Sequence, residues 1–457
     1  MPNDPATCDS ASPAEAAPGL AVTLTRRWHL PQRLAQLAME TPERTFLRVV
    51  GDKPCRETYA ETHDHASRWA GAVRDLGITP GEFVATMISD PRLCLHSWFG
   101  INAARCIEVP IHTDYRGNFL AHVLNTTGAR VAIVAAEFLP RFAEIADTVP
   151  ALERVVVVGA TNQDIELPMR ISSIEEHISA AAPLDESEWL TDSDICTVLF
   201  TSGTTGASKA VLVPFAHLRG TVEGAWPPGD LGSEDRYYSM LPLYHMAGKV
   251  AVGAMLQAGG QLVLRERFRT GAFWSDVRES GATCVCLMGS MTGFLMGDPE
   301  RENDRDHTLH KALVLPLPAN LAAFRERFGV AVRTVYNQTE TSSPIQSDGY
   351  VTHDYRAAGR PRPGVQCRIV DKNDVDVPPG VVGELVVRAN EPWSMMAGYL
   401  GMPEKTVESW RNLWLHTGDA FRRDSNGTYY FVDRLTDSLR RRGENISSVE
   451  LESSVCE

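Results

Sequence analysis

The sequence predicts a mixed α/β protein with more than one subdomain, and three observations lead to this fold class. The chain has 457 residues, which is too long for one compact hydrophobic core. From about residue 30, segments with helical spacing alternate with short apolar runs, the pattern of a parallel sheet covered by helices. Around residues 364–390 the pattern becomes Val/Ile alternation broken by Pro-Pro-Gly, which indicates an antiparallel subdomain such as a small barrel or meander.

The individual elements follow from hydrophobic spacing and from the residues that interrupt it. The segment 66–76 is amphipathic with a helical period and is followed by Gly77 and Pro80, which end helices. The run Phe83-Val-Ala-Thr-Met-Ile has the composition of a buried strand. The expected elements are helices over 34–39, 66–76 and 95–106 and strands over 83–88, 131–135 and 155–158.

Residues 1–25 are predicted to be a disordered leader. This segment is rich in Pro, Ala and Ser, is acidic, and lacks the cationic start and apolar core of a signal peptide. No apolar run approaches the length of a membrane span, so we expect no membrane insertion.

Charge and cysteine content restrict the partners and the compartment. The formal net charge of −14 argues against broad nucleic-acid binding and against anionic membrane surfaces. The nine cysteines are scattered without a CxxC pair, and Cys284 and Cys286 would point to opposite faces of a strand. This usage predicts reduced thiols in a cytoplasmic protein, which we expect to be a monomer or a homodimer.

The segment 199–215, LFTSGTTGASKAVLVPF, places a loop of small residues between two apolar runs. Residues 201–208 comprise three Thr, two Ser, two Gly and one Ala, and Lys209 follows. Glycines let backbone N–H groups approach a ligand, hydroxyls donate hydrogen bonds, and the lysine adds a positive charge. The spacing differs from the GxxxxGK[ST] nucleotide loop, but the composition suits a cluster of anionic oxygens such as a polyphosphate.

This loop and several later segments resemble the AMP-forming acyl-adenylate superfamily of acyl-CoA synthetases, adenylation domains and luciferases. TSGTTGASK is similar to the family's phosphate-binding loop, Tyr336-Asn-Gln-Thr-Glu to its Tyr-Gly-x-Thr-Glu, and Trp414-Leu-His-Thr-Gly-Asp to its Trp-x-x-Thr-Gly-Asp. Asp433-Arg434 through Gly443-Glu-Asn-Ile is similar to its hinge. The segments 323–330 and 441–446 look closest to crotonobetaine/carnitine–CoA ligases.

The resemblance implies a domain organisation. A large adenylate-forming domain over 26–435 would contain two α/β sheet subdomains and a small antiparallel β-barrel subdomain at about 360–430. Residues 436–457 would hold the hinge and the first segment of a C-terminal α+β domain that is otherwise largely absent. Family members carry in that domain a lysine that assists adenylation, so we expect a truncated chain with slow adenylation.

The resemblance also implies an ATP site. Tyr336 would lie against the adenine, Asp419 would accept both ribose hydroxyls, and Arg434 would contact the ribose or a phosphate. Thr339 would bond the α-phosphate. The residues expected to hold the β- and γ-phosphates are Thr201, Ser202, Gly203, Thr204, Thr205, Gly206 and Lys209.

The implied chemistry is adenylation of a carboxylate followed by transfer to a thiol, in most relatives that of CoA. Glu340 would bind Mg²⁺, a hard cation that prefers carboxylate and phosphate oxygens. His245 matches a residue of the pocket wall near the reacting carboxylate, although without the motif such a histidine is more often a core residue with its hydrogen bonds satisfied. The residues expected to carry catalysis are Thr204, Lys209, Thr339, Glu340 and His245.

Two residues at the expected acyl pocket, Asn337 and Gln338, depart from the family pattern, and Lys249 is a further candidate there. Asn337 stands where the family has Gly, and with Gln338 it would add amide groups and take up space. Lys249, four residues after His245, is predicted either to point into this pocket or to lie at the surface with its ammonium in water. A polar, shortened pocket favours a small or aromatic carboxylic acid over a long fatty acid.

Three other functions remain open from the sequence. A diazotase would activate nitrite with ATP for an aryl amine, with Asn337, Gln338 and Lys249 binding these polar groups. A non-catalytic module would bind a nucleotide only. An adenylation domain of a peptide synthetase would need a carrier domain after the hinge.

Overall fold

The computed structural model describes residues 28–160, 167–201, 208–351, 356–434, 439–441 and 444–446. The leader predicted over 1–25 lies outside these residues, as does most of the segment 436–457. The domain limits drawn from the sequence therefore stay predictions. Within the described residues the structure contains three large sheets, and no helix is both long and apolar enough to cross a membrane.

The first α/β sheet, sheet A, has seven strands in the order β14-β13-β12-β10-β11-β1-β2. All neighbouring pairs are parallel except β1 and the edge strand β2, which are antiparallel. Cys284 and Cys286, two residues apart on β12, are both buried in the same core cluster, so the prediction that they point to opposite faces is wrong: alternate residues of a strand share a face. The strands are β1 (Thr45–Val49), β2 (Cys55–Thr58), β10 (Arg236–Ser239), β11 (Gln261–Leu264), β12 (Cys284–Met288), β13 (Lys311–Leu315) and β14 (Ala331–Arg333).

The second α/β sheet, sheet B, has eight strands in the order β20-β9-β8-β4-β3-β5-β6-β7. Its central strands are parallel, whereas β9 pairs antiparallel with both β8 and β20. The strands are β3 (Phe83–Met87), β4 (Ile107–Pro110), β5 (Val131–Ala135), β6 (Arg154–Val158), β7 (Arg170–Ser173), β8 (Ile195–Thr201), β9 (Lys209–Pro214) and β20 (Gly398–Tyr399).

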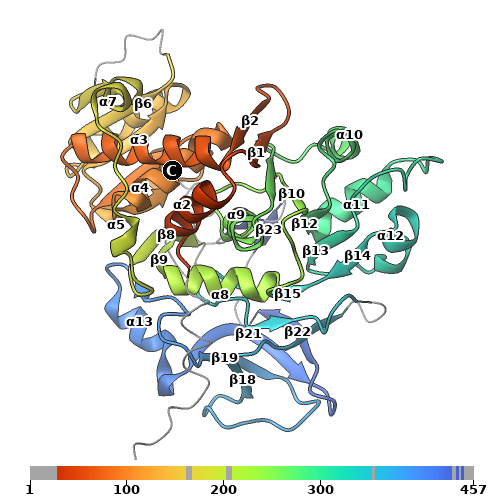
Figure 1. Ribbon diagram of the computed structural model, residues 1–457. Helices are drawn as coiled ribbons and strands as arrows, with labels where there is room; N and C mark the ends of the chain where they lie inside the picture. Colours follow the sequence, from red (N-terminus) through yellow and green to blue (C-terminus); the bar gives the residue numbers. More distant parts are fainter. Residues whose placement is uncertain are drawn as a thin grey trace, which may run out of the picture.

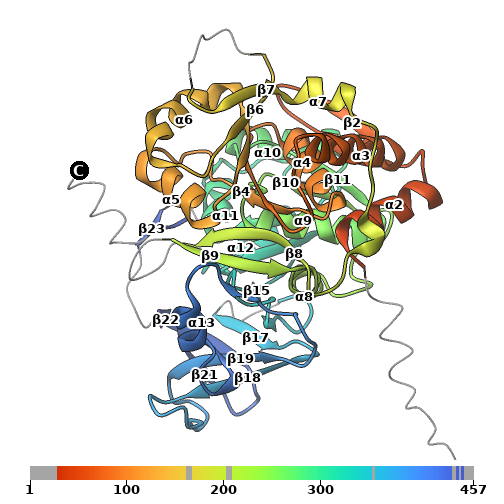
Figure 2. The same ribbon diagram turned by 90° about the vertical axis from the view of Figure 1, so that its left-hand side faces the viewer.

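The third sheet, the β-rich sheet, has seven strands in the order β15-β16-β17-β22-β21-β19-β18, and all of its pairs are antiparallel. It confirms the antiparallel subdomain predicted from the Val/Ile alternation and lies below the two α/β subdomains in Figures 1 and 2. Its strands are β15 (Val335–Tyr336), β16 (Ile345–Gln346), β17 (Ala357–Pro361), β18 (Val365–Val370), β19 (Gly383–Ala389), β21 (Leu415–Arg423) and β22 (Tyr429–Arg434); β23 (Leu439–Arg441) and β24 (Glu444–Ile446) pair separately.

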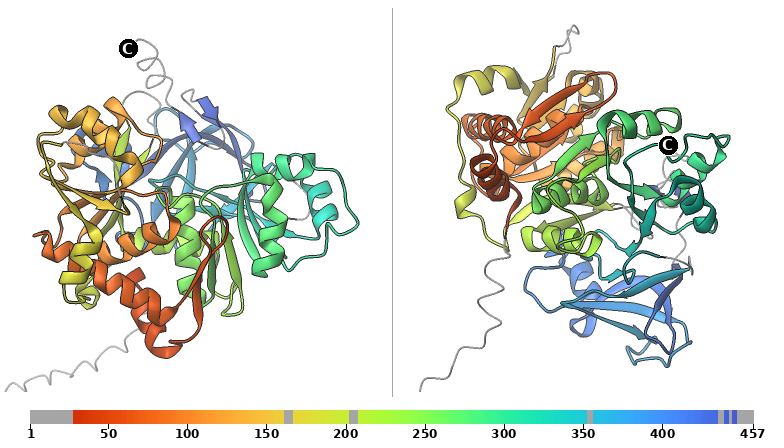
Figure 3. Two further views of the ribbon diagram at one scale, coloured as in Figure 1. Left: turned by 90° about the horizontal axis from the view of Figure 1, so that it is seen from above. Right: turned by 45° about the vertical axis from the view of Figure 1, so that its right-hand side comes forward.

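Helices cover the two α/β sheets, which occupy opposite sides of the molecule in the view from above (Figure 3). One buried cluster contains residues of both sheets and of α8 and α9, so the two α/β subdomains share a core. The helices are α2 (Leu30–Glu40), α3 (Tyr59–Asp75), α4 (Pro91–Ala103), α5 (Gly117–Thr127), α6 (Leu139–Ile145), α7 (Ile174–Ala180), α8 (Phe215–Ala225), α9 (Met246–Ala258), α10 (Thr270–Ser280), α11 (Gly289–Gly297), α12 (Leu321–Phe328) and α13 (Pro403–Ser409).

All three helices expected over 34–39, 66–76 and 95–106 begin earlier than the hydrophobic spacing indicated, and for α3 and α4 the caps decide the start. Thr58 and Glu61 form a capping box, so α3 begins at Tyr59 rather than at Ala66. The Asp90 side chain accepts two backbone N–H bonds and Pro91 follows it, so α4 spans 91–103 rather than 95–106.

Candidate active site

The predicted phosphate loop connects two paired strands of sheet B. Thr201 is the last residue of β8 and Lys209 the first of β9, and the two are directly paired across the hairpin. Both ends of the loop are therefore fixed by a buried antiparallel ladder. Ser202, Gly203, Thr204, Thr205 and Gly206 lie outside the described residues.

Tyr399 brings Lys209 and Glu340 together. The short strand β20 pairs with β9 and places the Tyr399 ring 4.8 Å from the Lys209 ammonium, measured to the ring centroid. The Tyr399 hydroxyl donates a hydrogen bond of 3.0 Å to Oε1 of Glu340. Burial, and then the charge of Glu340, raise the pKa of Tyr399, so the hydroxyl remains a donor at neutral pH. The expected phosphate lysine and the expected metal carboxylate thus contact one phenol.

The sequence interpretation missed Tyr399. The residue lies 190 positions after Lys209 along the chain, and β20 is only two residues long. No local periodicity reveals such a pairing, because the strand exists only through its ladder with β9.

A second cluster surrounds Asp419 on β21. This carboxylate is 3% exposed, and its Oδ2 accepts hydrogen bonds from the Tyr336 hydroxyl at 2.7 Å and from Nε2 of Gln338 at 2.8 Å. Arg434 on β22 is paired with Asp419 across the ladder, with Nε 3.5 Å from Oδ1. The Tyr336 ring also packs edge-on against Phe421. The three residues predicted for adenine and ribose, Tyr336, Asp419 and Arg434, are thus adjacent.

The turn after Tyr336 joins these two clusters. Oδ1 of Asn337 accepts a hydrogen bond from the backbone N–H of Ser343 at 2.7 Å and one from the Thr341 hydroxyl at 3.3 Å. The Asn337 amide therefore closes the turn, and the Gln338 amide donates a hydrogen bond to Asp419. A substrate contact for either amide stays a prediction. Thr339 lies half-buried on this turn, between Gln338 and Glu340.

His245 lies in a cluster of aromatic rings formed by two loops. It precedes α9, and its imidazole contacts Tyr244 and His112 edge-on, at centroid distances of 4.8 Å and 5.7 Å. His112, after β4, also stacks on Tyr115. Gly248 permits this loop, because a Cβ there would lie 2.2 Å from the carbonyl oxygen of Pro242. His112, Tyr115 and Tyr244 were not predicted: Tyr244 is the chain neighbour of His245, whereas His112 and Tyr115 reach it only after sheets A and B have packed together.

Lys249 is completely buried, so the prediction of a surface lysine is wrong. Its Nζ lies 2.5 Å from Oε2 of Glu108 on β4 and 3.6 Å from the ring centroid of Trp98 on α4. The Thr197 hydroxyl on β8 donates to the same Glu108 oxygen at 2.9 Å. The ammonium is thus held by an ion pair in the core. A substrate contact for Lys249 stays a prediction.

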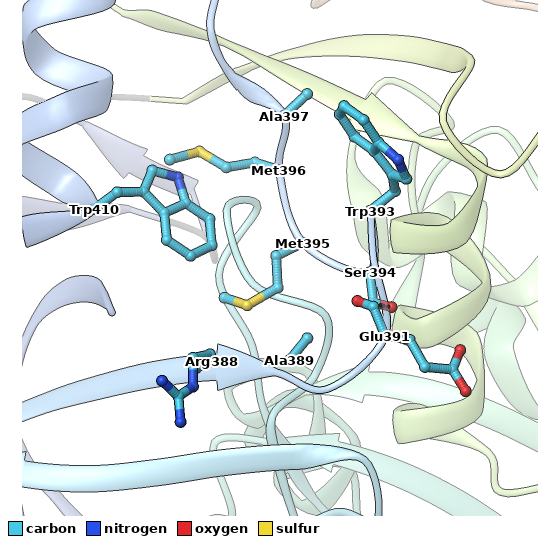
Figure 4. Close-up of a pocket in the computed structure, with 9 residues that line it drawn as sticks. All are labelled: Arg388, Ala389, Glu391, Trp393, Ser394, Met395, Met396, Ala397 and Trp410. Atoms are coloured by element: carbon cyan, nitrogen blue, oxygen red, sulfur yellow. Dashed lines mark hydrogen bonds between the residues drawn. The ribbon is translucent and has the colours of Figure 1, made fainter. Parts of the chain in front are cut away.

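A shallow cavity of about 300 Å³ lies beside the Glu340 turn. Figure 4 shows Trp393 and Trp410 on opposite sides of it, with Met395 and Met396 between them. The backbone N–H of Met396 donates to the carbonyl of Glu340 at 3.2 Å, so this segment supports the turn that carries the expected metal ligand.

Comparison with known proteins identifies the family. The profile of the AMP-binding enzyme family matches residues 34–400, which is most of the chain. The chain belongs to the AMP-binding enzyme family. A crotonobetaine/carnitine–CoA ligase of Salmonella typhi is 31% identical over 407 residues, covering 87% of this chain and 78% of the relative.

Solved structures of CoA ligases share the fold. The N-terminal domain of FACL13 from Mycobacterium tuberculosis superposes with a TM-score of 0.79 at 22% identity, covering 89% of this AMP-binding enzyme and 100% of that chain. An anthranilate CoA ligase, AuaEII, in complex with anthranoyl-AMP gives a TM-score of 0.78 at 24% identity, with 94% and 82% covered. The family and its CoA ligase relatives confirm the expectation of an ATP-dependent, AMP-forming acid–thiol ligase.

Proposed function

We propose that this AMP-binding enzyme adenylates a small or aromatic carboxylic acid and then transfers the acyl group to the thiol of CoA. The observation that carries the proposal is the contact of both Lys209 and Glu340 with Tyr399, since these are the residues expected to bind phosphate and Mg²⁺. Asp419, which Tyr336 and Gln338 hold by hydrogen bonds close to the turn that carries Glu340, would accept hydrogen bonds from a ribose.

The first step in this proposal joins acid and nucleotide. A carboxylate oxygen attacks the α-phosphorus of ATP in line, the bond to the bridging oxygen breaks, and pyrophosphate leaves. Lys209 and the adjoining loop would hold the leaving β- and γ-phosphates, and Thr339 would donate to the α-phosphate. Positioning and charge neutralisation supply most of the rate in such phosphorus chemistry.

Glu340 fits a magnesium ion. It offers a half-buried carboxylate that the Tyr399 hydroxyl orients, and hard divalent cations prefer such oxygens. A bound Mg²⁺ would neutralise charge on the phosphates. In the second step the CoA thiolate attacks the acyl carbon, a thioester forms, and AMP leaves with the electron pair of the broken mixed-anhydride bond.

The rings around His245 support a small or aromatic acid. The two imidazoles and two phenols pack on one another and are only partly buried, so a remaining exposed ring face would stack on an aryl group or attract the trimethylammonium group of a betaine-like acid. The nitrite hypothesis lacks such support, because the three polar side chains on which it rested have protein partners.

The test is release of AMP and pyrophosphate from ATP and Mg²⁺, with and without CoA. The panel would contain benzoic and aminobenzoic acids, short acyl acids, a trimethylammonium acid, and nitrite with an aryl amine. Release with one carboxylic acid, and a CoA thioester when CoA is added, is the expected result. Release only with nitrite would replace the proposal with a diazotase, and ATP binding without release would favour the binding module.

A further inference from the structure

Away from the ATP residues, Glu57, His65 and His96 form a cluster with no part in the proposed chemistry. Each of the three side chains offers an atom that could bind a metal, and these three atoms all lie within 4.8 Å of one another. Glu57 is on β2, His65 on α3 and His96 on α4, three elements that Figures 1 and 2 show together at the end of the molecule opposite the β-rich sheet.

The two imidazoles converge on the two oxygens of one carboxylate. Nε2 of His96 lies 2.8 Å from Oε2 of Glu57, and Nε2 of His65 lies 3.8 Å from Oε1. The imidazole rings are stacked, with centroids 4.6 Å apart. Zinc bonds of about 2.0–2.2 Å in a tetrahedron place ligand atoms about 3.4 Å apart, so small side-chain movements would close the three donors around an ion.

Burial distinguishes this cluster from a chance surface grouping. Glu57 and His96 are 5% and 2% exposed, whereas the His65 side chain is 44% exposed and gives access from solvent. The Thr62 hydroxyl donates to Oε2 of Glu57 at 3.3 Å and so helps to orient the carboxylate. The buried side chains of Glu57 and His96 are thus held in place, and the exposed side of the cluster at His65 would admit an ion and a water.

An ion would have to displace the proton that Nε2 of His96 shares with Glu57. Burial opposes ionisation of Glu57, but the hydrogen bond and charge of His96, with smaller effects of His65 and Arg92, hold the pKa of Glu57 below its usual value. Burial, and then the charge of His96, lower the pKa of His65. Arg92, on α4, is the charge in this region that would oppose a cation.

We infer that Glu57, His65 and His96 form a zinc site that stabilises the junction of the two α/β subdomains. The donor set of two imidazoles and one carboxylate is one that zinc accepts, with water as the fourth ligand. β2 is the edge strand of sheet A, while α3 and α4 pack on strands of sheet B. An ion bound to all three residues would therefore cross-link the two subdomains, which is a structural role independent of adenylation.

The test uses the whole chain, stripped with a chelator and titrated with Zn²⁺ alone by calorimetry, and with Co²⁺ by absorption. We expect a site of one ion per chain, a tetrahedral Co²⁺ spectrum without a thiolate charge-transfer band, and a higher melting temperature with Zn²⁺. His65→Asn should weaken Zn²⁺ binding by more than about 100-fold, because it removes a direct ligand, and loss of a residue that only supports a ligand already costs up to about 100-fold. Its half-exposed side chain makes the variant suitable, and circular dichroism would check its fold.

His63→Asn is the matched control, because His63 is on the same helix but pairs with Asp185 at 3.0 Å. Glu340→Gln is a second control, since it removes the expected Mg²⁺ ligand and should leave the Zn²⁺ titration unchanged. Equal Zn²⁺ affinity in the wild type, His65→Asn and His96→Asn would overturn the inference. A thiolate band would also overturn this ligand set, because it would place the ion on a cysteine such as Cys55.

Discussion

At the scale of single residues, the Tyr399 hydroxyl is the group whose removal tests the site most directly. Tyr399→Phe keeps the ring beside Lys209 but removes the hydrogen bond to Glu340. A hydrogen bond to a charged group contributes about 1.5–3 kcal/mol, so we expect kcat/KM for AMP release to fall about 10- to 100-fold. The melting temperature should change little.

Tyr430→Phe is the control for this variant. Tyr430 also donates its hydroxyl to a carboxylate, that of Asp424, at 3.2 Å, and neither residue is among the predicted site residues. Its activity should equal that of the wild type. Full activity of Tyr399→Phe would show that Glu340 needs no orienting partner.

His217 on α8 should make stability depend on pH. It is completely buried, and its Nε2 donates to the carbonyl of Thr341 at 2.9 Å, which attaches α8 to the turn carrying Asn337 and Glu340. Burial, with the charge of Arg362, lowers the pKa of His217 to about 4. The unfolded chain therefore binds a proton below about pH 6.5 while the folded chain does not, so stability is complete above pH 6.5 and falls as the pH drops towards 4.

The expected loss over this interval is about 3 kcal/mol in the free energy of unfolding. It would be measured by urea unfolding at several pH values. His217→Gln retains a side-chain N–H donor but does not titrate, so its stability should vary less between pH 6.5 and 4. An unchanged pH dependence in the variant would assign the effect to other groups.

At the scale of elements, the ion pair of Lys249 and Glu108 fastens α9 to β4. Removing one member of a buried pair leaves an uncompensated charge and costs about 3–5 kcal/mol. Lys249→Met should therefore strongly destabilise the protein, and Glu108→Gln in the same chain should recover most of the loss. The measurement is urea unfolding at pH 7 for both single variants and the double variant.

The surface pair of Lys405 and Glu408, 2.7 Å apart, provides the comparison. Its two side chains are more than half exposed, so the same substitutions should cost less than about 1 kcal/mol. Equal costs for the two pairs would mean that burial does not determine the strength of the core pair.

Sequence patterns located the elements better than they located the site contacts. The amphipathic segment 66–76 and the apolar run 83–88 became α3 and β3, because hydrophobic period is a local property. β4 was missed, since four residues ending in proline carry too short a pattern. Lys249 was indistinguishable from a surface lysine, because its burial depends on Glu108, which lies about 140 residues earlier in the chain.

The sequence motifs selected the residues expected to bind ATP, but they did not show which contacts hold those residues together. Tyr336, Asp419 and Arg434 were chosen from separate segments, and the β-rich sheet places them in contact. The bond from Gln338 to Asp419 had no signal in the sequence, because a glutamine in a turn has no preferred partner.

At the scale of the whole molecule, ATP should bind across two subdomains and so stabilise both. Lys209 belongs to sheet B and Asp419 to the β-rich sheet, and both are expected to contact the nucleotide. A ligand that binds only the folded state adds about 2.7 kcal/mol at 100 times its dissociation constant. Saturating ATP with Mg²⁺ should therefore raise the melting temperature of the entire cooperative transition.

Asp419→Asn should abolish most of this shift. The amide would turn an N–H group towards the donors of Tyr336 and Gln338, or else towards the ribose hydroxyls, so one acceptor is lost in either orientation. Asp433→Asn, an exposed carboxylate on the neighbouring strand, should retain the full shift. If both variants kept the wild-type rise in melting temperature with ATP, the ribose contact would have to lie elsewhere. Glu340 and Lys209 alone would then account for nucleotide binding.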